Sequence, residues 1–398
     1  MAMLRTLGAP TFFLTLSPVE KLCPELLVNL CKARDPASQI TGAEALNMED
    51  REKAELIAND PVTCARYFAY RSRKLLDLIE TDASPFYPHT VSDYLRRTEF
   101  QHRGSPHVHT MLWTTNRTAV DEPAGPPQYQ PGDPEAEAAC VAFIDQYMTC
   151  SSTAVPEELL RFQKHRHTFS CRKTRNRNQE TCRFGFPRFP MRATRILDPL
   201  TDEQKNQEQA DHLARIKAKL AEYWRTVRAA APIADTFDDY LRELQLTDEQ
   251  YIMAIRQSLD KNRSKIFLRR SPSEININNY NVRLLRLHRA NMDIQFVLDP
   301  FACVKYILSY INKANRGMSK LLRETVAEIN NRGNITIREK LKIIAKKFLN
   351  SSEISAQEAV FYLLALEVSK TSRDVSVSID FFFLTLFFLG NVYQHVTS

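Results

Sequence analysis

The stretch EFQHRGSPHVHTMLW, from Glu99 to Trp113, is the most informative part of the sequence for the fold and the chemistry of this protein. Its second half is rich in strand-forming residues and predicts a β-strand near His107 to Trp113. Side chains two positions apart project from the same face of a strand, so the two histidines of His-Val-His would point the same way. The Gly-Ser-Pro turn before them allows Glu99 to lie on the paired strand, opposite the histidines.

Two imidazoles on one face can share a divalent cation, and a carboxylate is a suitable third ligand. Glu99 is the candidate for that third position, and His102 is the competing choice. The pattern therefore predicts a metal site made of His107, His109 and Glu99. For the tripeptide alone, the simpler interpretation is a pair of ordinary surface histidines.

A second pattern follows about two hundred residues later, in CVKYILSYINK from Cys303 to Lys313. Tyr306 and Tyr310 are four residues apart and Lys313 three further, which stacks the three side chains along one face of a helix. The apolar residues form a separate stripe, so the phenols do not lie on the core side of the helix. Tyrosines at such spacing also occur at the margin of a core with their hydroxyls in water, which is the alternative.

A third pattern lies in a strongly basic segment. His165, His167, Cys171 and Cys182 supply two imidazoles and two thiolates, which is enough for a closed tetrahedral Zn²⁺ site. Scattered histidines and free cysteines are the alternative. Between residues 161 and 195 there are eleven Lys or Arg and one acidic residue. The side chains expected to contact DNA phosphates are Arg172, Lys173, Arg175, Arg177 and Arg183.

Phe184, Phe186 and Phe189 are interleaved with these basic residues. They could stack on unpaired bases, or they could be buried beside the metal.

These segments together resemble the replication-initiator region of Helitron transposases, a family of the endonucleases named for His-hydrophobe-His. The first similar segment is PTFFLTLS, from Pro10 to Ser17, continued at Pro24 to Leu26, although Cys23 stands where the family usually has Trp. The histidine segment, the KYxxxYIxK pattern and the HxHxxxC and CRFGFPR segments resemble the family in the same order. Similar sequence also occurs at residues 353–359 and 372–373.

The resemblance implies an α+β fold, an antiparallel-sheet nuclease core with helices that is interrupted by a helical and zinc-binding insertion. It implies Mg²⁺ or Mn²⁺ at the histidine site, polarising the scissile phosphate of single-stranded DNA. Tyr306 or Tyr310 would then form a covalent 5′-phosphotyrosine, and Lys313 would lie near phosphate. Two tyrosines permit two successive strand transfers, as in rolling-circle transposition. Nuclear localisation follows from the same resemblance.

The domain organisation predicted from the sequence has five parts. Residues 1–115 form the first half of the nuclease core, 116–200 a Pro/Gly-rich loop and the basic zinc module, and 201–270 a helical insertion. Residues 271–372 form the second half of the core, and 373–398 an atypical tail. Capping boxes at Thr201 to Gln204 and Thr247 to Gln250 are each expected to open a helix, the first running to about Ala230 in a solvated arm. Further strands are expected at residues 11–16 and 293–297.

Composition is consistent with an intracellular, phosphate-binding protein. The net charge is +7, and the eight cysteines are too sparse for a disulfide scaffold. The apolar run Phe381 to Leu389 is too short for a membrane-spanning helix, so no membrane partner is expected. No GxxxxGK[ST] motif occurs, so no ATP-driven helicase and no small-molecule cofactor are expected in this chain. A helicase would have to act in trans, which makes the chain a helicase-less fragment.

Two other functions are compatible with the same residues. One is a catalytically inactive DNA-binding transposon remnant that keeps the zinc module and the basic surface. The other is a metallohydrolase acting on nucleotides, which would need the histidines and not the tyrosines.

Overall fold

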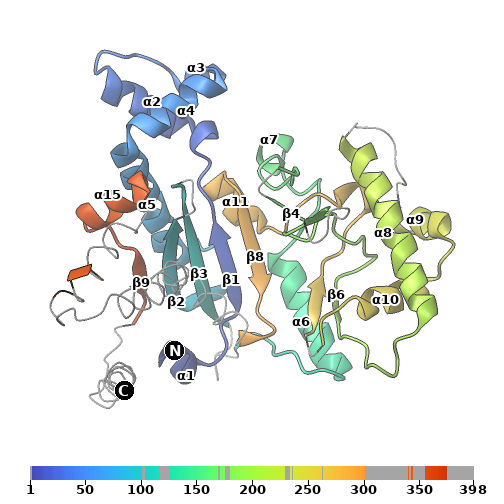
Figure 1. Cartoon of the computed structure of the whole chain (residues 1–398). Coiled ribbons are helices and arrows are strands. Elements are labelled where there is room, and N and C mark those ends of the chain that lie inside the picture. Colours follow the sequence, from blue (N-terminus) through green and yellow to red (C-terminus); the bar gives the residue numbers. More distant parts are fainter. Residues whose placement is uncertain are drawn as a thin grey trace.

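The computed structural model describes residues 2–100, 104–116, 125–168, 171–174, 180–228, 234, 236–261, 263–300, 339, 342–343 and 355–373. A five-stranded sheet in the order β8-β1-β3-β2-β9 lies at its centre (Figure 1). The strands are β1 (Phe12–Leu16), β2 (His89–Phe100), β3 (Pro106–Asn116), β8 (Met292–Phe296) and β9 (Ser369–Thr371). Every neighbouring pair is antiparallel. The expected α+β class with an antiparallel sheet is confirmed.

One face of the sheet carries the main hydrophobic core. Phe12 is fully buried, and its ring lies within 5.2–6.1 Å of four other aromatic rings, those of Phe86, Phe143, Tyr147 and Phe296. Helices α5 (Pro61–Ile79), α6 (Pro134–Tyr147) and α11 (Val282–His288) contribute apolar residues to this core. Because the residues alternate along each strand, Thr15 of β1 and His107 and His109 of β3 are directed to the opposite face.

The opposite face is apolar only at one end. There Phe13, Met111 and Trp113 pack with Met3 of α1 (Ala2–Leu7) and with Val297. The remaining part of this face carries Thr15 of β1 and the two histidines of β3, so the sheet places polar groups beside a small apolar cluster.

A group of helices extends from the end of β1. It comprises η1 (Glu20–Leu22), α2 (Pro24–Arg34), α3 (Gly42–Asn47) and α4 (Asp50–Asn59), and it leads into α5. Local signals explain the boundaries: Thr41 and Glu44 form a capping box at α3, and the Asp60 side chain accepts from Thr63 N at the start of α5. Pro24 and Pro61 occupy first-turn positions, where a missing N–H costs nothing.

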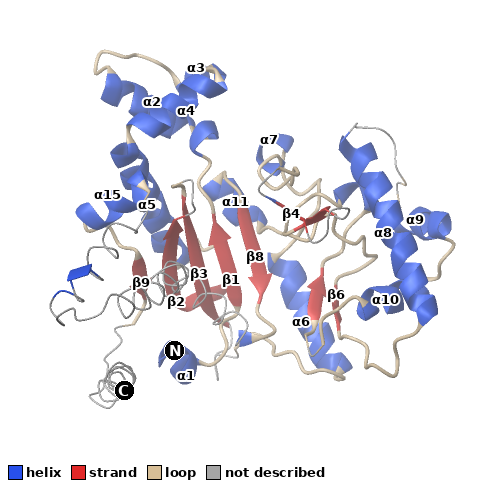
Figure 2. Cartoon of the chain, in the orientation of Figure 1, coloured by secondary structure: helices blue, strands red, loops and turns tan. Residues whose placement is uncertain are grey.

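A second lobe lies beyond β8 (Figure 2). It contains α8 (Gln207–Arg228), α9 (Phe237–Leu244), α10 (Asp248–Gln257) and the paired strands β6 (Arg195–Leu197) and β7 (Lys265–Phe267). Its own core includes Ile216, Leu220, Tyr240, Tyr251 and Phe267. The expected solvated arm is therefore wrong, because one side of these charged helices is apolar and packs together.

The first capping box is also placed differently from the prediction. Thr201 and Gln204 do exchange side-chain and backbone hydrogen bonds, but they close a single turn. Helix α8 begins at Gln207, where the Asn206 side chain accepts from Gln209 N at 2.9 Å. The second box, Thr247 with Gln250, does open α10 as predicted.

A smaller segment joins the second lobe to the free edge of β8. It includes α7 (Glu157–Leu160), the short hairpin of β4 (Arg172–Thr174) and β5 (Glu180–Cys182), and the turn η3 (Pro272–Glu274). Asn278 N donates to Gln163 O at 2.8 Å, and the Asn278 amide donates to Met292 O at 3.0 Å. Asn278 thus links the His/Cys-rich module to the sheet that carries the His-x-His strand, through its backbone N–H on one side and its side-chain amide on the other.

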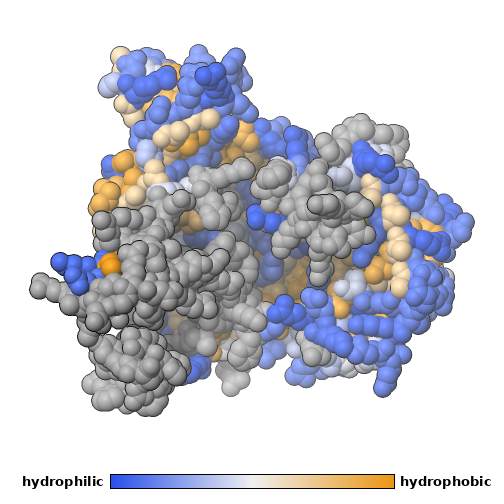
Figure 3. Space-filling model, in the orientation of Figure 1, coloured by the Kyte–Doolittle hydropathy of each residue, from blue (hydrophilic) through white to orange (hydrophobic). Residues whose placement is uncertain are grey.

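At the β9 edge of the sheet, opposite β8, α15 (Ala356–Leu363) packs against α5. Tyr362, Leu363 and Leu364 at its end are 46–83% exposed. Figure 3 shows hydrophobic colour over this helix, whereas α8 to α10 present a mostly hydrophilic surface.

Candidate functional site

His107 and His109 lie on β3, the central strand of the sheet, with β1 on one side and β2 on the other. The register pairs Glu99 with His107 across β2, and Thr15 with His109 across β1. Directly paired residues project from the same face. The structure therefore brings Glu99 and both histidines together on one face, in the arrangement expected from the sequence.

The contacts of the two imidazoles follow a common scheme. Nδ1 of His109 lies 3.1 Å from the Thr15 hydroxyl, and Nδ1 of His107 lies 3.0 Å from the Ser17 hydroxyl. Nε2 of His109 lies 3.0 Å from a carboxylate oxygen of Glu99. Nε2 of His107 is buried and has no hydrogen-bond partner among the residues that the structure describes. The Nδ1 side of each ring is thus held by a hydroxyl.

The surroundings keep His107 neutral. Burial lowers the pKa of His107 to about 4, with a further lowering by His109 that Glu99 opposes. A neutral imidazole has a lone pair for a metal, whereas a protonated one has none. On the other side of His109, the Asp293 carboxylate of β8 lies opposite Thr15, and burial raises its pKa.

These residues fit a divalent cation in their chemistry. A buried polar atom without a partner is uncommon in proteins, and Nε2 of His107 is such an atom, on a strand whose neighbour presents a carboxylate. The ligand atoms of Glu99, His107 and His109 are less closely gathered than those of the four-residue group described next. An ion bound here would have to bring them closer.

A second cluster in the described part of the chain is gathered tightly enough to hold an ion. One ligand atom each from His165, His167, Cys171 and Cys182 lies within 4.8 Å of every other. The separations are 3.3 Å between the two imidazole nitrogens, and 3.4 Å for both His167 to Cys171 and Cys182 to His165. A tetrahedron with zinc-length bonds has edges of about 3.3 Å between nitrogens and about 3.5 Å between nitrogen and sulfur. Three of the six donor separations therefore already match the edges of a zinc tetrahedron, and all six are at most 4.8 Å.

The environment of this four-residue group supports its shape. The His165 ring stacks on Phe186 with centroids 4.4 Å apart, and the His167 ring lies 4.3 Å from Trp224 of α8. Thr168 N donates to the Cys171 sulfur at 3.3 Å. Burial lowers the pKa of His165 to about 4, with His167 and Arg188 adding to the effect. Packing and desolvation thus hold a neutral imidazole at the cluster.

Residues 1–112 match the family model described as the Helitron helicase-like domain at the N-terminus. This segment is thus similar to the N-terminal region of Helitron proteins. The match includes β1, β2 and most of β3, and hence Glu99, His107 and His109. Searches among curated proteins and among solved structures gave no match. The Helitron-related region indicates a role in Helitron transposition and a nuclease- or helicase-like enzyme family.

The basic residues of the module are only partly described. Arg183 is exposed, and its guanidinium lies 4.6 Å from the centre of the Phe184 ring, which is 47% exposed. For Arg172 and Lys173 the structure gives the backbone of β4 alone, and Arg175 and Arg177 lie outside the described residues.

Of the three phenylalanines considered for base stacking, Phe184 is accessible. Phe186 is 7% exposed, and that expectation is wrong for it because its ring is stacked on His165 inside the second lobe. Phe189 is partly buried against the same core.

The predicted nucleophiles Tyr306 and Tyr310, together with Lys313, lie outside the described residues, as does His102. Their relation to the histidine site stays a prediction.

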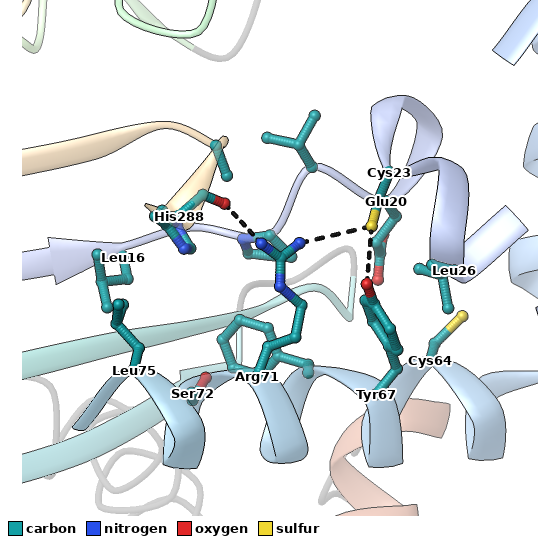
Figure 4. Close-up of a pocket in the computed structure, with 14 residues that line it drawn as sticks. Leu16, Glu20, Cys23, Leu26, Cys64, Tyr67, Arg71, Ser72, Leu75 and His288 are labelled. Carbon is teal, nitrogen blue, oxygen red and sulfur yellow. Dashed lines mark hydrogen bonds between the residues drawn. The ribbon is translucent and has the colours of Figure 1, made fainter. Parts of the chain in front are cut away.

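A pocket lies at the end of β1, and its lining includes Leu16 and Pro18, the neighbours of Ser17 in the chain (Figure 4). Arg71 of α5 reaches across it, donating from Nη2 to His288 O at 2.8 Å and from Nη1 towards the Cys23 sulfur at 3.5 Å. Nε2 of His288 lies 3.1 Å from Ser17 O. Cys23, the residue before α2, lines this pocket. The pocket contacts therefore fix the backbone of Ser17, the partner of His107.

Sequence reasoning did not single out Thr15, Ser17 or Asp293. The first two fall in PTFFLTLS, where the apolar residues define the strand and the hydroxyls look like ordinary strand residues. Their position next to the histidines depends on the pairing of β1 with β3, which the sequence alone does not reveal. Among the described helices, none is long and apolar enough to cross a membrane.

Proposed function

We propose that this chain nicks and joins single-stranded DNA in a metal-dependent reaction that passes through a covalent 5′-phosphotyrosine. The observation that carries the proposal is the His107, His109 and Glu99 constellation on one sheet face within the Helitron-related region. Nε2 of His107 is buried and has no partner among the described residues, which supports its role as a metal ligand.

Nε2 of both histidines and a carboxylate oxygen of Glu99 would hold Mg²⁺ or Mn²⁺. Such an ion polarises a phosphodiester and stabilises the charge that develops on its oxygens. The phenol of Tyr306 or Tyr310 gives up its proton, and its oxygen forms a bond to phosphorus. The bond to the 3′ oxygen breaks, and that oxygen takes a proton to become a free 3′-hydroxyl. Lys313 would offset phosphate charge, and the reverse reaction rejoins the strands.

We also propose that His165, His167, Cys171 and Cys182 hold a structural Zn²⁺. The match of their donor separations to zinc geometry supports this assignment. The ion would brace the hairpin of β4 and β5, whose flanking residues Arg183 and Phe184 pair a positive charge with an exposed ring. Proteins that bind single-stranded DNA combine phosphate contacts with stacking surfaces, and Arg172, Lys173, Arg175 and Arg177 add positive charge to this segment of the sequence.

As a part of Helitron transposition, the reaction would take place in the nucleus. It would depend on a helicase to expose the single strand. No small-molecule cofactor enters the proposed scheme.

The deciding experiment incubates the full chain with Mn²⁺ and single-stranded oligonucleotides labelled at either end, and then resolves the products on a denaturing gel. The expected product is a protein adduct that keeps the 3′ label. It should be lost in His107→Ala and in the double variant Tyr306→Phe/Tyr310→Phe. Tyr362→Phe, an exposed tyrosine on α15, is the matched control and should form the adduct normally.

Binding without an adduct under either Mn²⁺ or Mg²⁺, while an intact Helitron transposase cuts in parallel, would show a DNA-binding remnant. Cleavage that survives in the double tyrosine variant would instead show a metallohydrolase.

A further inference from the structure

The Nδ1 side of both histidines is held in the same way by one short segment of β1. Thr15 and Ser17 are two residues apart, and so are His109 and His107 on the antiparallel neighbour. The two hydroxyls therefore meet the two rings in register, at 3.1 Å and 3.0 Å. We infer that Thr15 and Ser17 are positioning residues that present Nε2 of both histidines to a divalent cation. This inference rests on the proposed function.

The choice of a hydroxyl has a chemical reason. A hydroxyl can donate one hydrogen bond and accept others, unlike a carboxylate or a carbonyl, which only accepts. Without an ion, Nε2 of His109 faces Glu99 at 3.0 Å; in the tautomer that donates from Nε2 to this carboxylate, the Thr15 hydroxyl donates to Nδ1. When Nε2 binds a cation, the proton belongs on Nδ1, and the same hydroxyl accepts from it. Thr15 can serve both states by rotating its hydrogen.

Ser17 has the corresponding role at His107. Nε2 of that ring is buried without a partner among the described residues, so the ring's hydrogen bond is the one between Nδ1 and the Ser17 hydroxyl. An Nδ1–H that donates to Ser17 leaves a lone pair on Nε2, which is the form that binds a metal. Second partners of this kind orient metal-binding histidines in many proteins, and their removal costs about 10- to 100-fold in affinity.

The backbone at Ser17 is held from both sides. Ser17 N donates to Asn291 O at 3.0 Å, and Ser17 O lies 3.1 Å from Nε2 of His288. Arg71 in turn donates to His288 O, and it extends towards Cys23 across the pocket of Figure 4. These contacts continue from Ser17 into α11 and α5, so the position of the hydroxyl is set by the fold and not by a free loop end.

The test measures Mn²⁺ binding to the zinc-loaded full chain by calorimetry, without DNA. Thr15→Val and Ser17→Ala should each weaken Mn²⁺ affinity by about 10- to 100-fold, whereas Thr15→Ser and Ser17→Thr should stay within about threefold of the unmodified chain. Thr110→Val is the matched control, because Thr110 lies next to His109 on the same strand and its buried hydroxyl has no partner among the described residues. It should leave Mn²⁺ binding unchanged.

Strand cleavage at rising Mn²⁺ provides a second readout. Thr15→Val should need more Mn²⁺ to reach half of its maximal rate and should then approach the rate of the unmodified chain. Circular dichroism and thermal unfolding without Mn²⁺ show whether each variant is folded. If Thr15→Val and Ser17→Ala are both folded and bind Mn²⁺ as tightly as the unmodified chain, the inference is overturned and the proposed function is unaffected.

A failure of the proposed cleavage can be distinguished from a failure of the positioning role. If Mn²⁺ binding depends on His107 and weakens in both variants, but no DNA adduct forms, the positioning role stands and the proposed cleavage does not. If the unmodified chain binds no Mn²⁺ that is sensitive to His107→Ala, the metal site itself is refuted and the inference falls with it.

Discussion

For the four-residue group of His165, His167, Cys171 and Cys182, the loss of zinc affinity on removing one ligand can be predicted from the structure. Three of its six donor separations, at 3.3–3.4 Å, differ by about 0.1 Å from the edges of an ideal zinc tetrahedron. Little reorganisation is needed, so zinc should bind with the full strength of a structural site, about 10–16 kcal/mol. Divided equally among four ligands, that is about 2.5–4 kcal/mol for each, or roughly 100- to 1,000-fold in Kd.

The perturbation is Cys171→Ser, which replaces a buried thiolate with a weaker ligand of similar size. Cys31→Ser is the control, because Cys31 is also buried but lies in α2, far from the group. The chain with Cys31→Ser should bind one zinc per molecule as tightly as the unmodified chain. Chelator competition should show the loss of affinity for Cys171→Ser alone.

Tryptophan emission reports the same event from inside the lobe. Trp224 lies 4.3 Å from the His167 ring, whereas Trp113, the other tryptophan, is in the cluster beside α1 and donates to Gly8 O. In a Trp113→Phe background, zinc removal should change the emission of Trp224, and zinc at about 1,000 times its Kd should raise the free energy of unfolding by about 4 kcal/mol. A reduced protein with no bound zinc and no zinc response would refute the assignment.

Three further predictions concern the core, the pH dependence and the DNA contact. Phe12→Ala should lower the free energy of unfolding by about 3–5 kcal/mol, because it empties a fully buried position among four aromatic rings; urea denaturation measures this loss, and a change below 1 kcal/mol would contradict it. Burial and Arg71 lower the pKa of His288 to about 4, so between pH 6.5 and 4 the unfolded chain binds more protons at His288 than the folded chain does. The free energy of unfolding that comes from the neutral His288 should therefore be lost as the pH falls from about 6.5 to about 4. Denaturation of the unmodified chain and of His288→Gln across that range should show a smaller loss in the variant. Phe184→Ala should weaken single-stranded DNA binding by about 1–3 kcal/mol in fluorescence anisotropy, with Tyr70→Ala, another exposed aromatic residue, leaving it unchanged.

Local patterns in the sequence were sufficient for several elements. The alternation in PTFFLTLS and in the His-x-His segment predicted β1 and β3, because period-two burial is a property of a strand and needs no knowledge of its partners. The box of Thr247 and Gln250 predicted the start of α10 for the same reason, since the four residues satisfy one another. The ligand types of the His/Cys group could also be read from the chain.

Only the tertiary structure decided which of these residues meet. Thr201 and Gln204 form the predicted bonds, yet α8 begins at Gln207, because Asn206 caps the helix where its apolar side packs into the second lobe. The hydroxyls of Thr15 and Ser17 become partners of His109 and His107 through the register between β1 and β3, and Asp293 joins them from β8, which pairs with β1 from a distant part of the chain. Local sequence encodes periodicity and capping, whereas such long-range pairing is set by the burial of apolar faces contributed by the whole chain.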